Sequence, residues 1–594
     1  MIKSPDKRLA GMLTLLFFLC SLASEAQGYL RAKGPIIVDG QGKKIILRGM
    51  GLGGWMLQEG YMFRLANFGQ QHKIRAAIQD LAGQQRTDAF YAQWLDNHTR
   101  KQDIDSMAAW GFNSVRLPMH YRLFTKAVEE EPIAGENTWL EKGFAMTDSL
   151  LSWCKANKIY LILDLHAAPG GQGNDLNISD RYPDRPSLWE SAANQQKMIA
   201  LWRKLAERYA NEPWIGGYDI INEPNWGFEN PTDKIGNREK TNAPLKTLMM
   251  EVTKAIRQVD KHHLIIIEGN AFGNNYNGIL PGWDPNMALS FHKYGTFNDE
   301  ASIRRYLDLR EQYQLPLWMG ESGENSNGWY TEAIRLVETH DIGWSWWPLK
   351  KMGSNNPLEI RVTPSYQRLL DYWGGKGPKP SPEEAGKALD EWIQSIRIEH
   401  NIFHKDVTDA MFRQVDAPTA IPFKKVFIRD SAVVAAVDYD LGGQRVAYYD
   451  KDTARYQYAS PPVNSAGNRG REYRNDGVDI QSGDRAGGSG DQTGGQGYYV
   501  FNIEDKEWLQ YTVDVAKEGD YSLQLRIAAA SDTGRISVMA DDRAPVGVAV
   551  PNTGGLGNWQ LVEAGTIHLH KGANVLRILA DKGGWNFKEI LLAR

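Results

Sequence analysis

Two glutamates, Glu223 and Glu321, carry the strongest chemical signal in this sequence. Glu223 stands in the segment 219–224 (DIINEP) and Glu321 in the segment 318–322 (WMGES), each directly after a short apolar run. Hydrolysis of an acetal uses two carboxyl groups, one that protonates the leaving oxygen and one that stabilises or captures the positive carbon. A separation of about 5–5.5 Å would give retention. The charge of Glu321 would raise the proton affinity of Glu223 and keep it protonated as an acid.

The surrounding elements predict a fold that brings these two glutamates together. Short β-rich runs alternate with longer helical patterns from about residue 36 to residue 347, which is typical of βα units and a parallel sheet. The runs are 45–49, 114–117, 159–165, 217–221, 264–268, 288–291, 316–320 and 342–347. Eight strands and eight helices over roughly 380 residues predict an α/β fold, a (β/α)8 TIM barrel with its active site at the carboxyl ends of the strands. Because Glu223 and Glu321 end the fourth and seventh runs, we expect them to face each other across one barrel mouth.

The N-terminus has the pattern of an export signal. Three basic residues precede the apolar run 12–23 and small residues follow it, so residues 1–26 are predicted to be a signal peptide and the protein to be secreted or periplasmic. The run is too short to span a bilayer comfortably, and no other stretch approaches 18 apolar residues, so we predict no membrane span. Cys20 lacks the small residue expected before a lipidated cysteine, and we therefore do not expect a lipid-anchored surface form.

Composition excludes several classes of protein. The 68 Lys and Arg residues nearly balance the 72 Asp and Glu residues, which argues against a basic nucleic-acid binder. The hydrophobic fraction of 42% argues against disorder. Cys20 and Cys154 are the only cysteines, so neither a disulfide framework nor a Cys-rich metal site is possible. The chain is rich in Trp and Tyr, whose flat amphipathic rings suit the binding of sugars. We expect a monomer.

Changes in sequence pattern predict the domain boundaries. The barrel domain is predicted at 28–415, with an early hairpin at 35–47 closing its floor and a helical insert at 57–93. A linker is predicted at 416–430. From 431–594 the pattern changes to short alternating strands separated by regular turns, which predicts a C-terminal antiparallel β-sandwich.

The barrel segment resembles glycoside hydrolase family 5, in its cellulase and exo-β-1,3-glucanase-like members, over roughly residues 28–412. The matching pieces, in order, are Leu47-Arg48-Gly49, Gly53-Gly54-Trp55, Arg116-Leu117-Pro118, Asp164-Leu165-His166, Ala168-Pro169-Gly170-Gly171, Asn222-Glu223-Pro224, His292, Tyr294, Gly320-Glu321 and Trp347. The resemblance implies that Glu223 is the acid/base and Glu321 the nucleophile of a retaining hydrolase.

The same resemblance implies six substrate-binding residues. Arg116 and Tyr294 would hold the nucleophile charged and oriented, and Asn222 would bond the 2-hydroxyl of the sugar. The other three would form the −1 subsite, namely His166, His292 and, as its floor, Trp347. Arg116 as a plain buried ion-pair member and His166 as a metal ligand are the alternatives. No second His or acid stands at ligand spacing from His166, so we expect no catalytic metal.

The C-terminal residues resemble carbohydrate-binding module family 6. The matching segments are 437–452, 472–480, 506–515, 519–531, 557–562 and 584–592. In that family an Asn and aromatic rings hold a sugar at the loop edge of the sandwich, and Tyr473, Trp559 and Asn586 match these positions. Leu556 replaces a frequent aromatic residue, which weakens the expected sandwich of rings. Alanines and a valine at 435–437 replace glutamates that help to bind a structural calcium, which argues against that ion, and we expect no other cofactor.

Together these signals predict a secreted retaining hydrolase of a polysaccharide, with a β-1,3- or β-1,4-glucan as the expected substrate. The segments 47–60 and 164–173 are similar to the branch of the family that attacks β-1,3-glucans by exo action. A β-mannanase or xylanase on the same barrel is the first alternative. A non-catalytic polysaccharide-binding protein is the second, although such a protein needs no pair of charged groups at one sugar. Transglycosylation would use the same residues.

Overall fold

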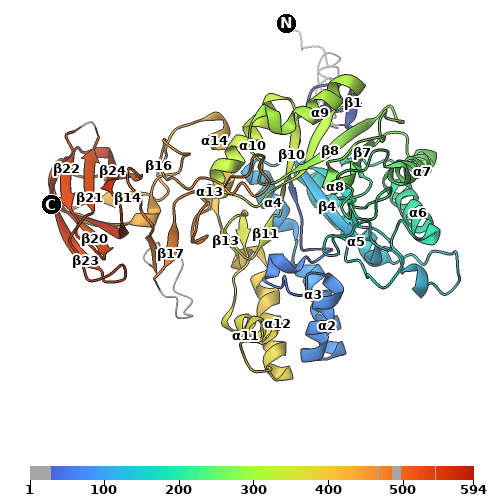
Figure 1. Ribbon diagram of the computed structural model, residues 1–594, viewed down its shortest axis with the longest axis horizontal. Helices are drawn as coiled ribbons and strands as arrows, with labels where there is room; N and C mark the ends of the chain where they lie inside the picture. Colours follow the sequence, from blue (N-terminus) through green and yellow to red (C-terminus); the bar gives the residue numbers. More distant parts are fainter. Residues whose placement is uncertain (1–27, 464–466, 484–496, 542) are drawn as a thin grey trace, which may run out of the picture.

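The computed structural model describes residues 28–463, 467–483, 497–541 and 543–594, and it consists of a barrel followed by a β-sandwich (Figure 1). The predicted signal peptide, residues 1–26, lies outside the described residues. In the part of the chain that the structure describes, every helix is too short or too polar to cross a membrane.

Eight parallel strands close into a barrel in the spatial order β10-β3-β4-β5-β6-β7-β8-β9. These strands are β3 (Arg48–Gly51), β4 (Ser114–His120), β5 (Tyr160–Ala167), β6 (Ile215–Asp219), β7 (Leu264–Glu268), β8 (Met287–Lys293), β9 (Leu317–Gly323) and β10 (Gly343–Trp347). Each overlaps one of the eight predicted runs, so the predicted TIM barrel is confirmed.

Helices cover the outside of the barrel. They are α4 (Lys101–Trp110), α5 (Glu141–Ala156), α6 (Ala192–Tyr209), α7 (Ala243–Val259), α9 (Glu300–Tyr313) and α10 (Asn327–Thr339), with α13 (Lys405–Met411) and α14 (Arg413–Asp416) packed beside α10. Between β7 and β8 the described chain forms only the four-residue α8 (Asn270–Gly273) instead of a full helix.

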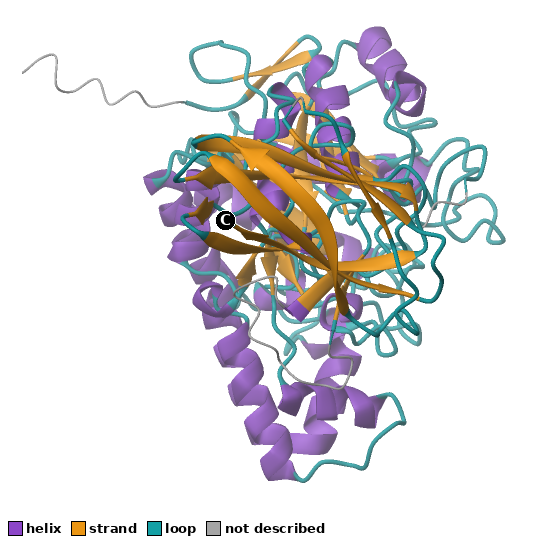
Figure 2. Cartoon of the chain, turned by 90° about the vertical axis from the view of Figure 1, so that its left-hand side faces the viewer, coloured by secondary structure: helices purple, strands orange, loops and turns teal. Residues whose placement is uncertain are grey.

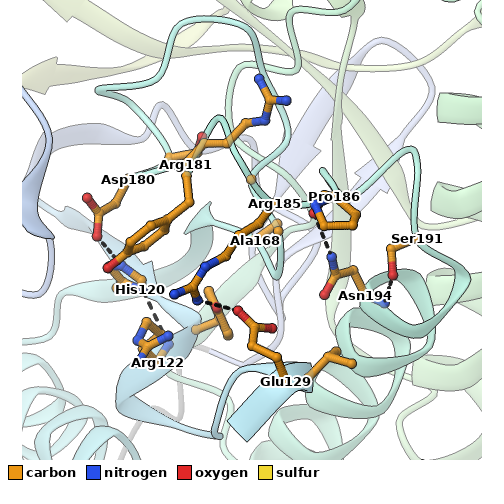
Figure 3. A pocket seen from close by; sticks show the side chains of 16 residues that line it. His120, Arg122, Glu129, Ala168, Asp180, Arg181, Arg185, Pro186, Ser191 and Asn194 are labelled. Carbon is orange, nitrogen blue, oxygen red and sulfur yellow. Dashed lines mark hydrogen bonds and ion pairs between the residues drawn. The ribbon is translucent and has the colours of Figure 1, made fainter.

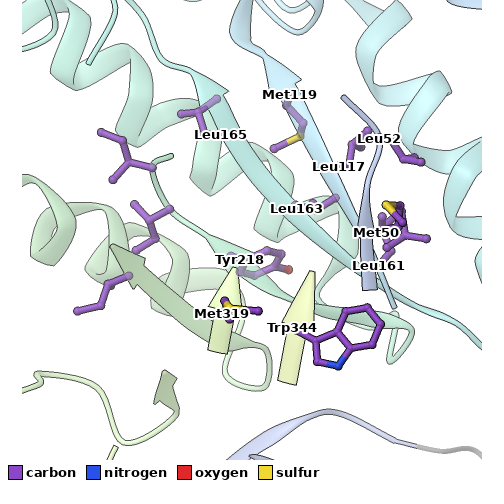
Figure 4. Close-up of a cluster of buried hydrophobic side chains, with 14 of the residues drawn as sticks. Met50, Leu52, Leu117, Met119, Leu161, Leu163, Leu165, Tyr218, Met319 and Trp344 are labelled. Atoms are coloured by element: carbon purple, nitrogen blue, oxygen red, sulfur yellow. The ribbon is translucent and has the colours of Figure 1, made fainter. Parts of the chain in front are cut away.

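Alternate residues of each barrel strand face the helices and the barrel interior. In β5, Leu161, Leu163 and Leu165 pack in the layer between the strands and the helices (Figure 4). Tyr160 and Ile162, at the intervening positions, belong to a separate apolar cluster inside the barrel. This is the period of two that a strand imposes on its side chains. The inward positions nearer the carboxyl ends are polar, and they form the site described below.

A short hairpin closes the floor of the barrel. Strands β1 (Arg31–Lys33) and β2 (Ile36–Val38) pair antiparallel through a turn at Gly34-Pro35. The chain reverses again at Asp39-Gly40, within the predicted hairpin 35–47, where Val38 pairs antiparallel with Lys44. Leu30 and Ile37 join the apolar cluster inside the barrel. Apolar side chains of the hairpin therefore fill the amino-terminal end of the barrel.

The predicted helical insert is part of a larger helical extension, seen at the bottom of Figure 1. Its elements are η1 (Gly60–Phe63), α2 (Gln71–Ala82), α3 (Gln84–Asn97), α11 (Pro364–Trp373) and α12 (Pro382–Ser395). Helices α11 and α12 are flanked in the sequence by a small sheet. It contains β11 (Lys350–Lys351), β12 (Leu358–Glu359) and β13 (Ile402–Phe403), and η4 (Ile398–His400) precedes β13. Trp94 and Trp392 pack in the apolar cluster of the extension, and Trp347 of the barrel belongs to the same cluster. The extension therefore reaches the barrel mouth.

The C-terminal domain is a β-sandwich, as predicted, and Figure 2 shows it in front of the barrel. One six-stranded sheet contains β14 (Val426–Ile428), β16 (Tyr448–Tyr449), β19 (Trp508–Val515), β21 (Arg535–Ala540), β22 (Val546–Ala549) and β24 (Gly572–Lys582). The other contains β15 (Ser431–Ala435), β17 (Ile480–Ser482), β18 (Tyr498–Val500), β20 (Gly519–Ala529), β23 (Gln560–Leu569) and β25 (Trp585–Ala593). Strand β14 lies within the segment 416–430 that the sequence suggests as a linker, and it pairs parallel with β19.

Candidate active site

Glu223 and Glu321 lie close together at the carboxyl ends of the barrel strands. Glu223 follows β6 in the loop, and Glu321 is in β9. One carboxylate oxygen of each and one ring nitrogen of His292 all lie within 4.8 Å of one another. Both glutamates are buried, with 8% and 6% of their surface exposed. This spacing is close to the roughly 5–5.5 Å that retaining glycosidases use.

A β-bulge in β9 turns Glu321 into the barrel mouth. Phe291 of β8 pairs with Met319, but His292 pairs with Glu321, so Gly320 is the extra residue. Without the bulge, alternation would point Glu321 outward, because Met319 packs toward the helices. A Cβ added at Gly320 would lie 2.1 Å from Ser290 Oγ, so the bulge requires glycine. A glycine at position 320, directly before Glu321, is therefore needed to point the carboxylate into the barrel mouth.

Glu223 is held from both sides by the ends of β7 and β8. Its backbone has φ of 43°, in the left-handed region, and its amide donates to Glu268 Oε2 at 2.7 Å. Its Oε1 lies 2.6 Å from His292 Nδ1. Burial opposes protonation of His292, but the charges of Glu268 and Glu321 and the hydrogen bond to Glu223 outweigh it and raise the pKa of His292 well above its usual range. The short contact therefore places Glu223 beside a histidine whose charged form is favoured.

Glu321 is fixed by Arg116 and Tyr294. The Arg116 guanidinium donates to Glu321 Oε2 at 2.8 Å, and the Tyr294 hydroxyl donates to Oε1 at 2.7 Å. Both carboxylate oxygens thus accept a strong hydrogen bond, one of them charge-assisted. The two hydrogen bonds therefore fix the orientation of the carboxylate.

Arg116 is the centre of a buried charged cluster. Its side chain is fully buried and lies 3.2 Å from Asp164, 3.0 Å from Asp219 and 3.2 Å from Glu268, besides Glu321. Burial, helped by the charge of Glu268, raises the pKa of Asp219 well above its usual range. Burial also opposes ionisation of Glu268, but His292 and Arg116 outweigh it and lower its pKa. One guanidinium thus contacts four acidic side chains, and Asp219 is the one whose pKa is raised.

The remaining barrel residues that the resemblance implies lie at the same barrel mouth. Asn222 accepts from Arg116 at 2.7 Å, and its amide nitrogen lies 3.4 Å from His166 Nε2. His166 is bonded to Asp164 at 2.8 Å and stacks on Trp347, with ring centroids 5.0 Å apart and planes at 10°. Trp347 in turn donates to the Tyr61 hydroxyl at 2.9 Å.

Trp347 lies directly on the backbone of the first barrel strand and its loop. A Cβ added at Gly51 or Gly53 would come within 2.5 or 2.7 Å of its indole ring. The Gly53-Gly54 motif therefore leaves room for the ring. The ring and His166 form one flat wall of the mouth, as expected for an aromatic subsite floor.

Sequence reasoning missed Glu59, a third carboxylate in this mouth. It is 7% exposed, and its Oε1 lies 3.8 Å from His166 Nε2. Burial raises the pKa of Glu59 to about 7, opposed by His166 and supported by the charges of Glu321 and Glu223. Glu59 lies in the segment 47–60, but nothing in its spacing marked it. By contrast, Asp164, Asp219 and Glu268 occupy inward strand positions that strand alternation could have identified.

We predict that Glu59→Gln stabilises the protein at alkaline pH. A carboxyl group whose pKa is about 7 in the folded protein and 4.5 as a model compound makes the fold less stable as pH rises between these values. Glutamine does not titrate, so the free energy of unfolding of the variant, relative to wild type, should rise by up to about 3 kcal/mol from pH 4.5 to pH 8. Urea denaturation at both pH values measures this difference. If the difference in the free energy of unfolding between variant and wild type is the same at both pH values, Glu59 is ionised at neutral pH.

A polar cavity of about 450 Å³ opens beside the ends of β4 and β5 (Figure 3). His120, the last residue of β4, lies 3.3 Å from Asp180. Burial opposes ionisation of Asp180, but hydrogen bonds from His120 and His72 outweigh it and lower its pKa to about 2. Ala168, which lines the cavity, comes two residues after His166, so the cavity opens at the same end of the barrel as the glutamates.

The three residues suggested in the C-terminal domain do not form one cluster. Asn586 donates to the Leu556 carbonyl at 2.8 Å, and Trp559 packs edge-on against Tyr499 at 5.1 Å. Tyr473 instead packs against Tyr498, whose side chain points to the opposite face of β18 from Tyr499. The aromatic partner of Trp559 is therefore Tyr499, which the sequence motif did not identify. At 435–437 the structure places buried alanine and valine side chains, which cannot bind calcium through a carboxylate.

Comparisons with known proteins match both parts of the chain. The family model described as cellulase (glycosyl hydrolase family 5) matches residues 75–353, and the model described as carbohydrate binding module (family 35) matches residues 474–590. A β-xylosidase from Phanerodontia chrysosporium is 30% identical over 386 residues, covering 59% of this chain and 76% of that protein. Endoglucanase C from Acetivibrio thermocellus is 25% identical over 325 residues, covering 44% of this chain and 87% of that protein.

One solved structure bears on the C-terminal domain. The C-terminal CBM6 of the marine laminarinase LamC from Zobellia galactanivorans is 30% identical and covers 16% of this chain and 81% of that chain, with a TM-score of 0.16. The family model at residues 474–590 confirms the predicted carbohydrate-binding module, and it is family 35 where the motifs resemble family 6.

Proposed function

The chain belongs to glycosyl hydrolase family 5, and we propose that it cleaves β-glycosidic bonds of a polysaccharide with retention of configuration. The observation that carries this proposal is the pair of buried carboxylates, Glu223 and Glu321, with oxygens within 4.8 Å. Two carboxyl groups at this spacing leave no room for a water molecule to attack from the far side of the sugar, so one of them must act as the nucleophile.

The hydrogen bonds of the two glutamates support Glu321 as the nucleophile and Glu223 as the acid/base. Glu321 accepts from Arg116 and Tyr294, so it is held in one orientation for attack on the anomeric carbon. Glu223 lies 2.6 Å from His292 Nδ1 and is the group that can pass a proton to the leaving oxygen. In the first step the Glu321 oxygen forms a bond to the anomeric carbon while the glycosidic bond breaks. In the second step Glu223 takes a proton from water, and the resulting hydroxide displaces Glu321.

The other residues of the mouth bind the sugar in this proposal. Asn222 lies between Arg116 and His166 and offers an amide to the 2-hydroxyl. Trp347 and His166 provide a flat surface for the sugar ring. Glu59, neutral below about pH 7 because burial raises its pKa, can donate a hydrogen bond to a further hydroxyl.

We infer that the substrate is a β-glucan, linked β-1,3 or β-1,4. The segments 47–60 and 164–173 resemble β-1,3-glucan-hydrolysing members, and an endoglucanase is among the relatives. A xylose-based substrate is the second candidate, because the relative with 30% identity is named a β-xylosidase. In this proposal the protein is exported by residues 1–26, and its C-terminal module binds polysaccharide.

Product analysis tests the reaction. Proton NMR during hydrolysis of an activated aryl β-glycoside should show the β-anomer of the free sugar first, with the α-anomer appearing only by mutarotation. The α-anomer as the first product would contradict the double displacement. Sizing the products from a panel of β-1,3-glucan, β-1,4-glucan, mannan and xylan then identifies the substrate and separates exo from endo action.

A further inference from the structure

A second cavity lies where the barrel meets the C-terminal domain. It measures about 320 Å³, within the range of roughly 300–1,000 Å³ that small-ligand pockets occupy. Both domains line it. The barrel contributes, among others, Tyr61, Glu324 and Lys351, and the C-terminal domain contributes Arg455, Gln457 and Arg471.

The two domains are bonded firmly together around this cavity. Asn325 exchanges two hydrogen bonds with the backbone of Arg455, at 2.7 and 2.9 Å. Asn475 donates to the Asn325 carbonyl at 2.8 Å and its own carbonyl accepts from the Asn327 amide at 2.8 Å. These three asparagines are all buried. Ala454 is buried within the apolar cluster of the barrel itself. The C-terminal domain therefore forms a fixed wall of the cavity.

The cavity adjoins the mouth that holds the two glutamates. Tyr61, in its lining, accepts a hydrogen bond from the Trp347 indole, which is the floor of the proposed sugar site. Glu324, also in its lining, comes three residues after Glu321. From the other domain, the Tyr458 amide donates to the Gly295 carbonyl at 3.0 Å, directly after Tyr294. The cavity and the mouth are therefore joined through the hydrogen bond between Tyr61 and Trp347.

The lining of the cavity is polar and carries excess positive charge. Lys351 is paired with Glu324, the acid of the lining. Arg455 and Arg471 are exposed at its edge. Within the described residues their hydrogen bonds are all made by backbone atoms, so both guanidiniums are available to a ligand. Amides such as Gln457 and Asn468 supply further donors and acceptors for hydroxyl groups. Guanidinium groups bind carboxylates in preference to neutral hydroxyls.

We propose that this cavity is a distal sugar-binding subsite, built jointly by the two domains, and that Arg455 and Arg471 make it selective for chains that carry acidic sugars. This inference rests on the proposed function, since it needs a polysaccharide held between Glu223 and Glu321. In this arrangement the C-terminal domain is part of the substrate cleft of the enzyme.

The test compares the neutral polysaccharide that the enzyme hydrolyses fastest with its carboxymethylated derivative. The measured quantity is the ratio of kcat/KM for the carboxymethylated chain to kcat/KM for the neutral chain, at low ionic strength. We expect Arg455→Gln with Arg471→Gln to lower this ratio by about three- to tenfold, since each exposed charge pair contributes modestly. The double lysine variant keeps the charge and should stay within about twofold of wild type, as should the control Arg429→Gln, an exposed arginine of the C-terminal domain outside the cavity.

Two further measurements make the outcome decisive. A short activated aryl β-glycoside carries no acidic sugar, so the double Gln variant should hydrolyse it at the wild-type rate. High salt should abolish the difference between the wild type and that variant on the carboxymethylated chain. If the double Gln variant keeps the wild-type ratio, the subsite proposal is wrong. If the wild type does not hydrolyse the aryl glycoside at all, the proposed function itself has failed.

Discussion

Glu321→Ala is expected to lower kcat/KM for an activated aryl β-glycoside by roughly 10⁴-fold or more, because it removes the group that forms the covalent intermediate. Glu223→Ala should leave the first step on such a substrate much less affected, since a good leaving group needs no proton. The second step then lacks its base, and a glycosyl-enzyme should accumulate as a burst of released phenol. Glu251→Ala, an exposed position on α7, serves as the control and should keep the wild-type rate.

Azide distinguishes the two glutamates by product stereochemistry. In Glu321→Ala the anion can enter the space left by the carboxylate and attack the substrate directly, which gives the α-glycosyl azide. In Glu223→Ala azide attacks the glycosyl-enzyme from the opposite side, which gives the β-glycosyl azide. Chromatography and NMR of the products identify each anomer. The reverse assignment of anomers would exchange the roles of the two residues, and full activity of both variants would exclude hydrolysis at this site.

The barrel could be predicted from the sequence because the β-rich run that marks a strand occurs eight times. Each strand run is followed by a turn and most by a helical stripe, so an error in one element, such as the short α8, leaves the fold class unchanged. The places of Arg116 and His166 in the site came from the family resemblance.

Several details of the site depend on local geometry that residue types do not encode. Simple alternation would point Glu321 outward, and the bulge at Gly320 reverses it. Glu59 lies in a loop of the extension and reaches the mouth only because that loop folds across it. In the C-terminal domain, the two adjacent tyrosines Tyr498 and Tyr499 face opposite sides of β18, and the motif alone did not distinguish which of them packs against Trp559.

The largest loss of stability is expected from Arg116→Met. The guanidinium is fully buried among Asp164, Asp219, Glu268 and Glu321, and removing it leaves buried negative charge without a partner. Breaking a buried ion pair on one side costs about 3–5 kcal/mol. Denaturant unfolding should show this decrease in the free energy of unfolding. The matched control is Arg48→Met, whose half-exposed pair with Glu338 should cost no more than about 1 kcal/mol.

The pH dependence of this loss identifies its electrostatic cause. In the wild type, His292 and Arg116 lower the pKa of Glu268 despite its burial, so this carboxylate stabilises the fold above its unfolded pKa and loses that effect as pH falls. Without Arg116 the pKa of Glu268 rises, and the folded variant takes up protons more readily than the unfolded chain. The stability difference between wild type and Arg116→Met should therefore be greatest near pH 8 and shrink toward pH 5. A difference that is constant over this range would mean that Arg116 acts through packing alone, because lost van der Waals contacts do not titrate.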